Sequence, residues 1–180
     1  MILYHVGFVE IPEPDVHFGR KNADFGQGFY MSDNYEFSCR WSKERKGSDT
    51  ILNTYAFDPE GLQILRMERD EEWLAYVYDN RGWKPDRFPQ ADVVIGPIAN
   101  DTIYNTLGII TSGLLTREQA MKLLLIGPVY RQIVLKTERA AARLRWLSAR
   151  CLETEEIRRY RAAVAEEEAE YQRMVAEAME

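Results

Sequence analysis

The chain has 180 residues, of which 46% are hydrophobic and 29% charged, and its formal net charge is −6. This composition is typical of a soluble globular protein, and the negative charge disfavours a broad nucleic-acid-binding surface. No run approaches the roughly 20 apolar residues that span a bilayer, and the N-terminus lacks a secretory leader, so we expect a cytoplasmic protein with Cys39 and Cys151 reduced.

The first strands of the chain are predicted on either side of a long loop. "ILYHV" (residues 2–6) and "GFYMS" (residues 28–32) are rich in β-branched and aromatic residues. The intervening prolines and glycines of residues 11–27 exclude regular structure. Gly26 and Gly28, directly before the second strand, indicate a turn or a close approach by other atoms.

A helix is predicted to follow the second strand. Asp33, with Glu36 three residues later, fits a capping box, and Gly47 is expected to end the helix. Three side chains at three-residue spacing share one face of it: Tyr35, Ser38 and Trp41.

The next region is predicted to form a hairpin and then a helix. "TILNTYAFD" (residues 50–58) alternates as a half-buried strand, residues 59–61 turn the chain, and "LQILRM" (residues 62–67) returns beside it. "DEEWLAYVYDNRG" (residues 70–82) has acids in its first turn and glycine at its end, which indicates a helix.

The second half of the chain is predicted to mix strands and helices without a strict repeat. "ADVVIGPI" (residues 91–98) suits a buried strand, and residues 115–127 form a helix with Thr116 as its cap and Gln119 as the box partner. "QIVLKT" (residues 132–137) is a further strand, and residues 142–147 are a strand or a short helix. This mixture favours an α+β domain, which we place at residues 1–150.

The C-terminal segment, residues 151–180, is predicted to be one amphipathic helix from Thr154 onward. Its apolar stripe consists of Ile157, Tyr160, Val164, Tyr171, Met174 and Val175. A helix docked on its own domain is slightly favoured. The alternative is a helix that mediates homo-oligomerisation or binds a small inhibitory protein.

Two motifs together resemble the ADP-ribosyltransferase superfamily, in the branch that includes poly-ADP-ribose polymerases and diphtheria toxin. "FGQGFYMSD" (residues 25–33) resembles its second-strand motif and "LYHVG" (residues 3–7) its first. Further segments resemble an uncharacterised bacterial family assigned to this fold, and the likeness covers roughly residues 2–147. The resemblance implies a split antiparallel β-sheet with flanking helices, with NAD as co-substrate and no metal.

The resemblance implies three catalytic positions. His5 is expected to form a hydrogen bond with the adenosine-side ribose, and Tyr30 is expected to stack on nicotinamide. The third position, a glutamate in the family, is Gln132 here. A carboxylate there stabilises the positive charge that develops as the bond to nicotinamide breaks, and glutamine lacks that charge. Glu138 lies six residues further on, nearly 20 Å along a strand, and is rejected as its substitute.

Other residues receive supporting roles from the same resemblance. Those expected to bind the cofactor are Val6, Gly7, Arg20, Gly28, Phe29, Ser38 and Trp41. Asn100 and Asp101 are expected to contact the acceptor or the ribose, or else to cap the following helix. Val6 stands where the family usually has glycine, which narrows the approach to its backbone. Each aromatic or histidine also has an ordinary structural interpretation in the core.

Two functions remain open. The first is an NAD-dependent mono-ADP-ribosyltransferase that modifies a macromolecular acceptor, protein or nucleic acid, with a bacterial toxin or defence effector as one expected role. The second is a catalytically weak or inactive module of the same fold that binds NAD, ADP-ribose or a protein. Gln132 is the residue that discriminates between them.

Overall fold

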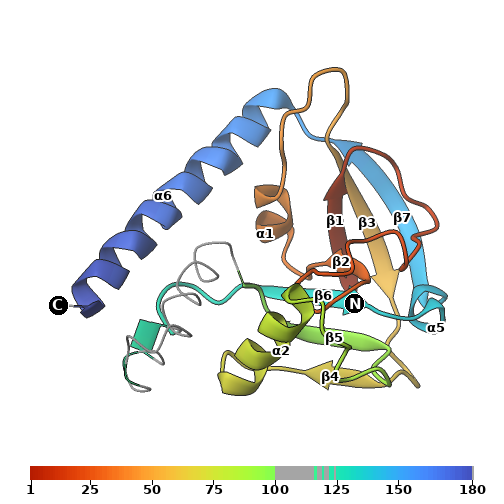
Figure 1. The fold of residues 1–180 in the computed structure, drawn as a ribbon. Coiled ribbons are helices and arrows are strands. Elements are labelled where there is room, and N and C mark those ends of the chain that lie inside the picture. Colours follow the sequence, from red (N-terminus) through yellow and green to blue (C-terminus); the bar gives the residue numbers. More distant parts are fainter. Residues whose placement is uncertain (100–115, 117–118, 120–121, 124, 180) are drawn as a thin grey trace.

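Two β-sheets form the centre of the fold in this computed structural model (Figure 1). The structure describes residues 1–99, 116, 119, 122–123 and 125–179. The three-stranded sheet has the order β1-β3-β7 and is antiparallel throughout. Its strands are β1 (Ile2–Gly7), β3 (Ile51–Phe57) and β7 (Leu144–Cys151).

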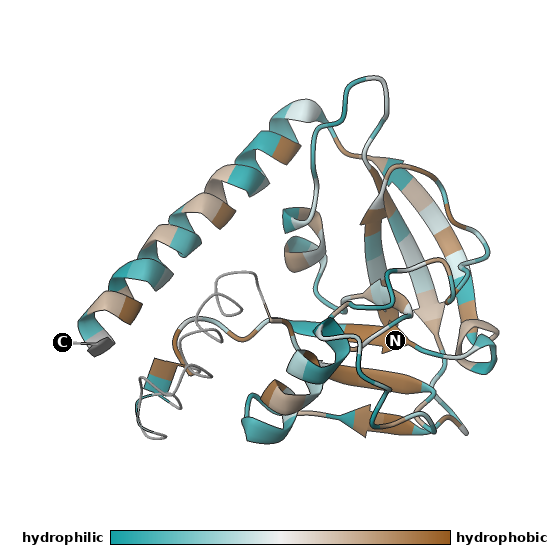
Figure 2. Ribbon diagram, in the orientation of Figure 1, coloured by the Kyte–Doolittle hydropathy of each residue, from teal (hydrophilic) through white to brown (hydrophobic). Residues whose placement is uncertain are grey.

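The four-stranded sheet has the order β2-β6-β5-β4. Its strands are β2 (Phe29–Met31), β6 (Arg131–Leu135), β5 (Val93–Pro97) and β4 (Ile64–Arg66). All neighbours are antiparallel except β4 and β5, which are parallel, so this sheet is mixed. The strand β5 is wholly buried and apolar, and β6 is apolar from Ile133 to Leu135 (Figure 2), as expected for strands covered on both faces.

The predicted hairpin over residues 50–67 is wrong. Gly61 turns the chain with a φ of 76°, but β4 then joins the other sheet and pairs with β5. Both edges of β3 are occupied, one by β1 and one by β7, so no edge is left for β4. The strand predicted as one alternative for residues 142–147 is confirmed as the start of β7, after the short helix α5 (Glu138–Ala141).

The first helix, α1 (Tyr35–Arg40), is shorter than predicted and has a different cap. Asn34, not Asp33, accepts a hydrogen bond from the backbone of Phe37 at 2.9 Å. The helix ends at Trp41 instead of Gly47, because residues 43–49 are all exposed and offer no apolar face to pack.

The other helix ends agree more closely with prediction. The helix α2 (Glu71–Arg81) is capped by Asp70, which accepts from the backbone of Trp73, and it ends at Gly82. Thr116 and Gln119 make the reciprocal bonds of a capping box, at 3.0 and 3.2 Å. Most of the helix predicted there lies outside the described residues.

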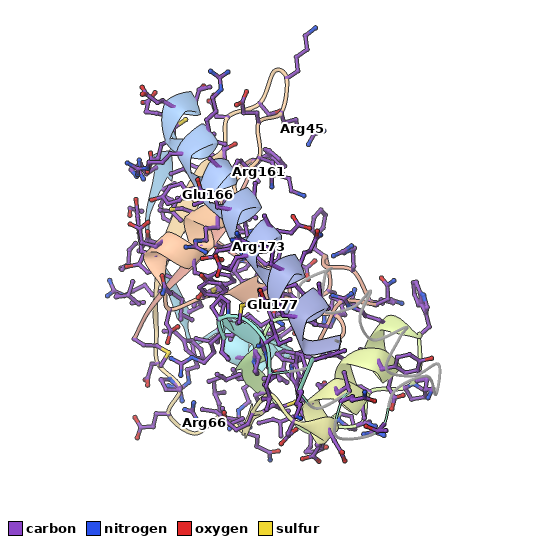
Figure 3. All side chains as sticks on the ribbon, turned by 90° about the vertical axis from the view of Figure 1, so that its left-hand side faces the viewer. Arg45, Arg66, Arg161, Glu166, Arg173 and Glu177 are labelled. Carbon is purple, nitrogen blue, oxygen red and sulfur yellow. The ribbon has the colours of Figure 1, made fainter. Side chains whose placement is uncertain are left out.

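The long helix α6 (Thr154–Met179) docks on the body of the protein (Figure 1). Its buried side chains are Ile157, Tyr160 and Tyr171, and the first two pack with Cys39, Leu52 and Leu152. Charged side chains occupy its outer face, among them Arg161, Glu166, Arg173 and Glu177 (Figure 3). The predicted docking on its own domain is thus present at Ile157, Tyr160 and Tyr171, whereas Met174 is 40% exposed. A role of this helix in homo-oligomerisation or in binding a small inhibitory protein stays a prediction. None of the described helices is long and apolar enough to cross a membrane.

The side chains of the four-stranded sheet separate into two cores, because successive residues of a strand point to opposite faces. One core, between the two sheets, includes Leu3, Phe29, Met31, Tyr55, Ile133 and Leu135. The other, beneath α2, includes Phe25, Trp73, Tyr76, Val94 and Val134. Tyr30 packs against this second core, so the side chains of Phe29 and Tyr30 lie on opposite faces of the four-stranded sheet.

Candidate functional site

The candidate site lies where the two sheets separate. A single isolated bridge joins β1 to the segment after β2, through paired backbone bonds between Tyr4 and Ser32 of 2.8 and 3.1 Å. Along a strand, backbone groups alternate between its two edges. The N–H and C=O of Val6 therefore lie on the same edge of β1 as those of Tyr4, just past the bridge. The sheet divides at this point.

His5 sits at this division with one ring nitrogen occupied. Its Nδ1 lies 2.8 Å from the carbonyl oxygen of Tyr30, which only accepts, so Nδ1 carries the proton. Burial lowers the pKa of His5, and the ring is neutral at pH 7. Nε2 thus keeps a lone pair, and a methyl group built on Gly7 would come within 3.4 Å of it. Gly7 leaves that edge of the imidazole open.

The ring of His5 packs on the side chain of Phe29, with centroids 4.6 Å apart. Tyr30 points to the opposite face of β2, toward the core beneath α2. The structure therefore brings His5 and Tyr30 together through the Tyr30 backbone, and Phe29 is the aromatic residue that contacts the imidazole directly.

The hydroxyl of Tyr30 is held by the loop that precedes β2. It donates to the carbonyl of Gly26 at 2.6 Å and accepts from the amide of Phe25 at 3.0 Å. Burial raises the pKa of this hydroxyl well above its usual range; the charge of Asp24 raises it further, while that of Arg20 lowers it. Tyr30 is therefore a fixed, protonated phenol, with an exposed Arg20 near it.

Gln132 lies on the same face of the sheet as Tyr30. It is a buried residue of β6, 8% exposed, and pairs with Gly96, whereas Tyr30 pairs with Val134 two positions away. Residues in this diagonal relation lie about 7–8 Å apart. Its Nε2 donates to Oδ2 of Asp24 at 3.3 Å.

Asp24 is a further polar residue of the site, and no sequence motif gave it a role. Its Oδ1 accepts two bonds from Arg81, at 2.8 and 2.5 Å, and its Oδ2 accepts from the amide of Ala99 at 2.9 Å. The Asp24 and Arg81 side chains are 12% and 16% exposed. Asp24 lies in the loop directly before the motif glycines, whereas Arg81 ends α2, 57 residues further along the chain, so no local sequence signal pointed to this pair.

Asn53 is a second buried residue that sequence reasoning missed. It pairs with His5 across β1 and β3 and is fully buried. Its side chain accepts from the amide of Ile11 at 2.9 Å and donates to the carbonyl of Val9 at 3.0 Å. Asn53 thereby anchors the segment that leaves β1 beyond His5.

The glycines of the loop are required by the protein's own packing. A methyl group on Gly28 would lie 2.6 Å from the backbone oxygen of Leu135 and from a methyl of Val134. One on Gly19 would lie 2.6 Å from the oxygen of Gly28. Gly26 has a φ of 73°, which L-residues rarely adopt. The loop closes tightly on β6 whether or not a ligand approaches it.

Gly28→Ala is therefore expected to lower the free energy of unfolding by about 1–3 kcal/mol. The added methyl group would clash with the backbone oxygen of Leu135, which cannot move aside as the end of a flexible side chain can. Urea unfolding followed by circular dichroism measures this. Gly7→Ala is the matched control, because its added methyl meets only ordinary contacts of 3.4 Å and longer. Equal stability of the two variants would contradict this explanation of Gly28.

The remaining predicted residues are placed as follows. Ser38 is buried and donates to the carbonyl of Asn34 at 2.9 Å, whereas Trp41 is 54% exposed and meets Phe37 edge-on. Glu138 begins α5, outside β6, and its side chain lies 3.8 Å from His17. Asn100 and Asp101 lie outside the described residues.

A cavity of about 370 Å³ opens close to Gln132, at the ends of β4 and β5 and the starts of α1 and β6. Gly96, the strand partner of Gln132, contributes to its lining, as do Phe37, Glu68, Tyr130 and Arg131. Across the described part of the chain, no three His, Cys, Asp or Glu side chains converge as metal ligands do.

Comparison with known proteins identifies one family. The family model described as "Protein of unknown function (DUF3990)" matches residues 1–146, which include β1 to the start of β7 and stop before α6. No curated protein matches the chain.

Proposed function

The chain belongs to the DUF3990 family, and we propose that it binds NAD where its two sheets divide and transfers ADP-ribose to a macromolecular acceptor, releasing nicotinamide. We propose the split sheet of ADP-ribosyltransferases as the finer description of its α+β fold. Among the described residues, the Tyr4–Ser32 bridge is the isolated backbone bridge that joins the two sheets, and this arrangement supports that description.

The observation that carries the proposal is the state of His5. A neutral imidazole with its Nδ1 proton engaged by Tyr30 presents Nε2 as an acceptor, which suits a ribose hydroxyl. Gly7 keeps that nitrogen accessible. The adjacent edge of β1 offers the N–H and C=O of Val6, a donor and an acceptor that match the carboxamide of nicotinamide.

The groups further from His5 fit the same ligand. Trp41 is exposed and available to stack on nicotinamide, and the Arg20 guanidinium is suited to the pyrophosphate. Gln132 takes the place of the glutamate of ADP-ribosyltransferases, as an uncharged acceptor for a ribose hydroxyl. Asp24 adds a carboxylate behind it, but its charge is compensated by Arg81.

The same ion pair favours a second candidate function. In transfer chemistry, an unpaired anion near the ribose stabilises the developing positive charge, and loss of one such group typically costs 100-fold to 1000-fold in rate. A glutamine backed by a carboxylate that is ion-paired with Arg81 is consistent with slow transfer. It is also consistent with a module that binds NAD or ADP-ribose without turnover.

Calorimetry with NAD and with free nicotinamide tests the proposal. Binding of NAD is expected at or below millimolar concentration, and Gly7→Ala is expected to weaken it roughly tenfold, about 1.4 kcal/mol, by occupying the space beside Nε2. The same variant should bind free nicotinamide like the parent, since the ribose hydroxyl is then absent. If neither ligand binds at millimolar concentration, the proposed site is wrong.

NAD affinity is also expected to fall in acid. The folded pKa of His5 lies below its unfolded value of 6.5 because burial disfavours the charged ring. Protonation of Nε2 removes the acceptor, so binding weakens as the pH approaches that lowered pKa. His17→Gln, which changes the chain's other histidine, should leave this pH dependence intact.

The free energy of unfolding is also expected to fall in acid. Below pH 6.5 the unfolded chain binds a proton at His5, whereas the folded chain binds that proton more weakly. The contribution of neutral His5 to the free energy of unfolding is therefore fully present above pH 6.5 and declines as the pH falls. The free energy of unfolding should therefore depend less on pH between 7 and 5 in His5→Gln than in the parent. Parallel slopes for the two proteins would contradict a lowered pKa of His5 in the folded chain.

A further inference from the structure

The amide of Gln132 has only one orientation that satisfies its neighbour. Oδ2 of Asp24 is a carboxylate oxygen, which accepts hydrogen bonds and cannot donate. The amide end that faces it at 3.3 Å must be the NH₂ group. The carbonyl Oε1 of Gln132 is consequently directed away from Asp24.

Asp24 is itself immobilised from two other parts of the chain. Arg81, at the end of α2, donates twice to Oδ1, and the amide of Ala99, just after β5, donates to Oδ2. Rotation of the carboxylate would break at least one of these three bonds. Oδ2 is therefore a fixed acceptor, and it fixes the amide of Gln132.

We propose that Asp24 is a positioning residue, which orients Gln132 so that its Oε1 accepts a hydrogen bond from a ribose hydroxyl of the substrate. This inference rests on the proposed function. A glutamine side chain on its own can present either its NH₂ donor or its carbonyl acceptor to a ligand, whereas the carboxylate at this position in ADP-ribosyltransferases presents acceptors only. Asp24 removes that ambiguity and makes the glutamine act as an acceptor.

A double-mutant cycle on nicotinamide release from NAD tests the coupling. Asp24→Asn is expected to lower kcat at least tenfold in the parent, with KM changed less than threefold, and to have little further effect in Gln132→Ala. A purely structural role for Asp24 would lower the rate equally in both backgrounds. That additive result would overturn the proposal.

Asp92→Asn is the matched control. Asp92, directly before β5, is a buried carboxylate that accepts bonds from Gln63 and Thr137 and pairs with Arg139, and none of its hydrogen bonds or ion pairs involves Gln132. Its effect should be additive with Gln132→Ala. If Asp24→Asn fails to fold, Asp24→Glu, which keeps the charge but displaces the carboxylate, takes its place in the cycle.

A measurement without substrate separates this inference from the proposed function. The side-chain amide protons of Gln132, assigned by their loss in Gln132→Ala, should exchange with solvent at least tenfold faster in Asp24→Asn, and unchanged exchange would overturn the positioning role. If the amide responds as expected but the parent neither binds nor cleaves NAD, the proposed function fails, and the role of Asp24 toward the ribose fails with it.

Discussion

Gln132→Ala is expected to lower the rate of nicotinamide release from NAD by on the order of 100-fold while NAD affinity changes little. Gln132 is buried and fixed, so the alanine variant removes one preorganised acceptor without disturbing the division of the sheets at His5. A group that acts mainly in the transition state changes kcat more than binding. Nicotinamide release by liquid chromatography and calorimetric binding of NAD together distinguish these effects.

Gln90→Ala, an exposed glutamine changed in the same way, serves as the control and should keep the parent's rate. Gln132→Glu supplies a charge and should hold or raise turnover. Because the Asp24 carboxylate lies beside this position, the two acids repel, so the gain should increase with pH as the added carboxyl ionises. Full activity of Gln132→Ala would refute the assigned role. A parent that binds NAD without any turnover would favour the binding module.

Local features of the fold were predictable from sequence. The Thr116–Gln119 capping box was predicted from two residues three positions apart, and both of its bonds are present, as is the predicted end of α2 at Gly82. The strands β1, β2, β5 and β6 follow from side-chain periodicity and apolar runs. At α1 the neighbouring Asp33 and Asn34 are both good caps, and sequence spacing did not decide between them.

Contacts between distant residues were not predictable in this way. The partner of β4 was misassigned because a turn at Gly61 is compatible with a hairpin or with a crossing to another sheet, and only the occupied edges of β3 decide. In the candidate site, His5, Tyr30 and Gln132 were found through motif resemblance. Asp24 and Arg81 are 57 residues apart, and no local pattern couples them.

The salt bridge between Asp24 and Arg81 is expected to give the largest single effect on stability. Arg81→Met should lower the free energy of unfolding by about 3–5 kcal/mol, because Asp24 then remains largely buried without its cation. Methionine retains much of the apolar length of arginine, so the loss should reflect charge more than packing. Urea unfolding, monitored by tryptophan fluorescence and analysed at constant m-value, gives the difference.

Two comparison variants make this result specific to buried charge. Arg143→Met removes the partner of Asp58 in an exposed salt bridge, in which the Arg143 side chain is 48% exposed and that of Asp58 is 59% exposed. This substitution should lower the free energy of unfolding by less than about 1 kcal/mol. The double variant Asp24→Asn/Arg81→Met removes both charges and should recover part of the stability lost in Arg81→Met alone. If the double variant is instead less stable than Arg81→Met, Asp24 stabilises the loop mainly through the Ala99 amide and Gln132, and its pairing with Arg81 is secondary.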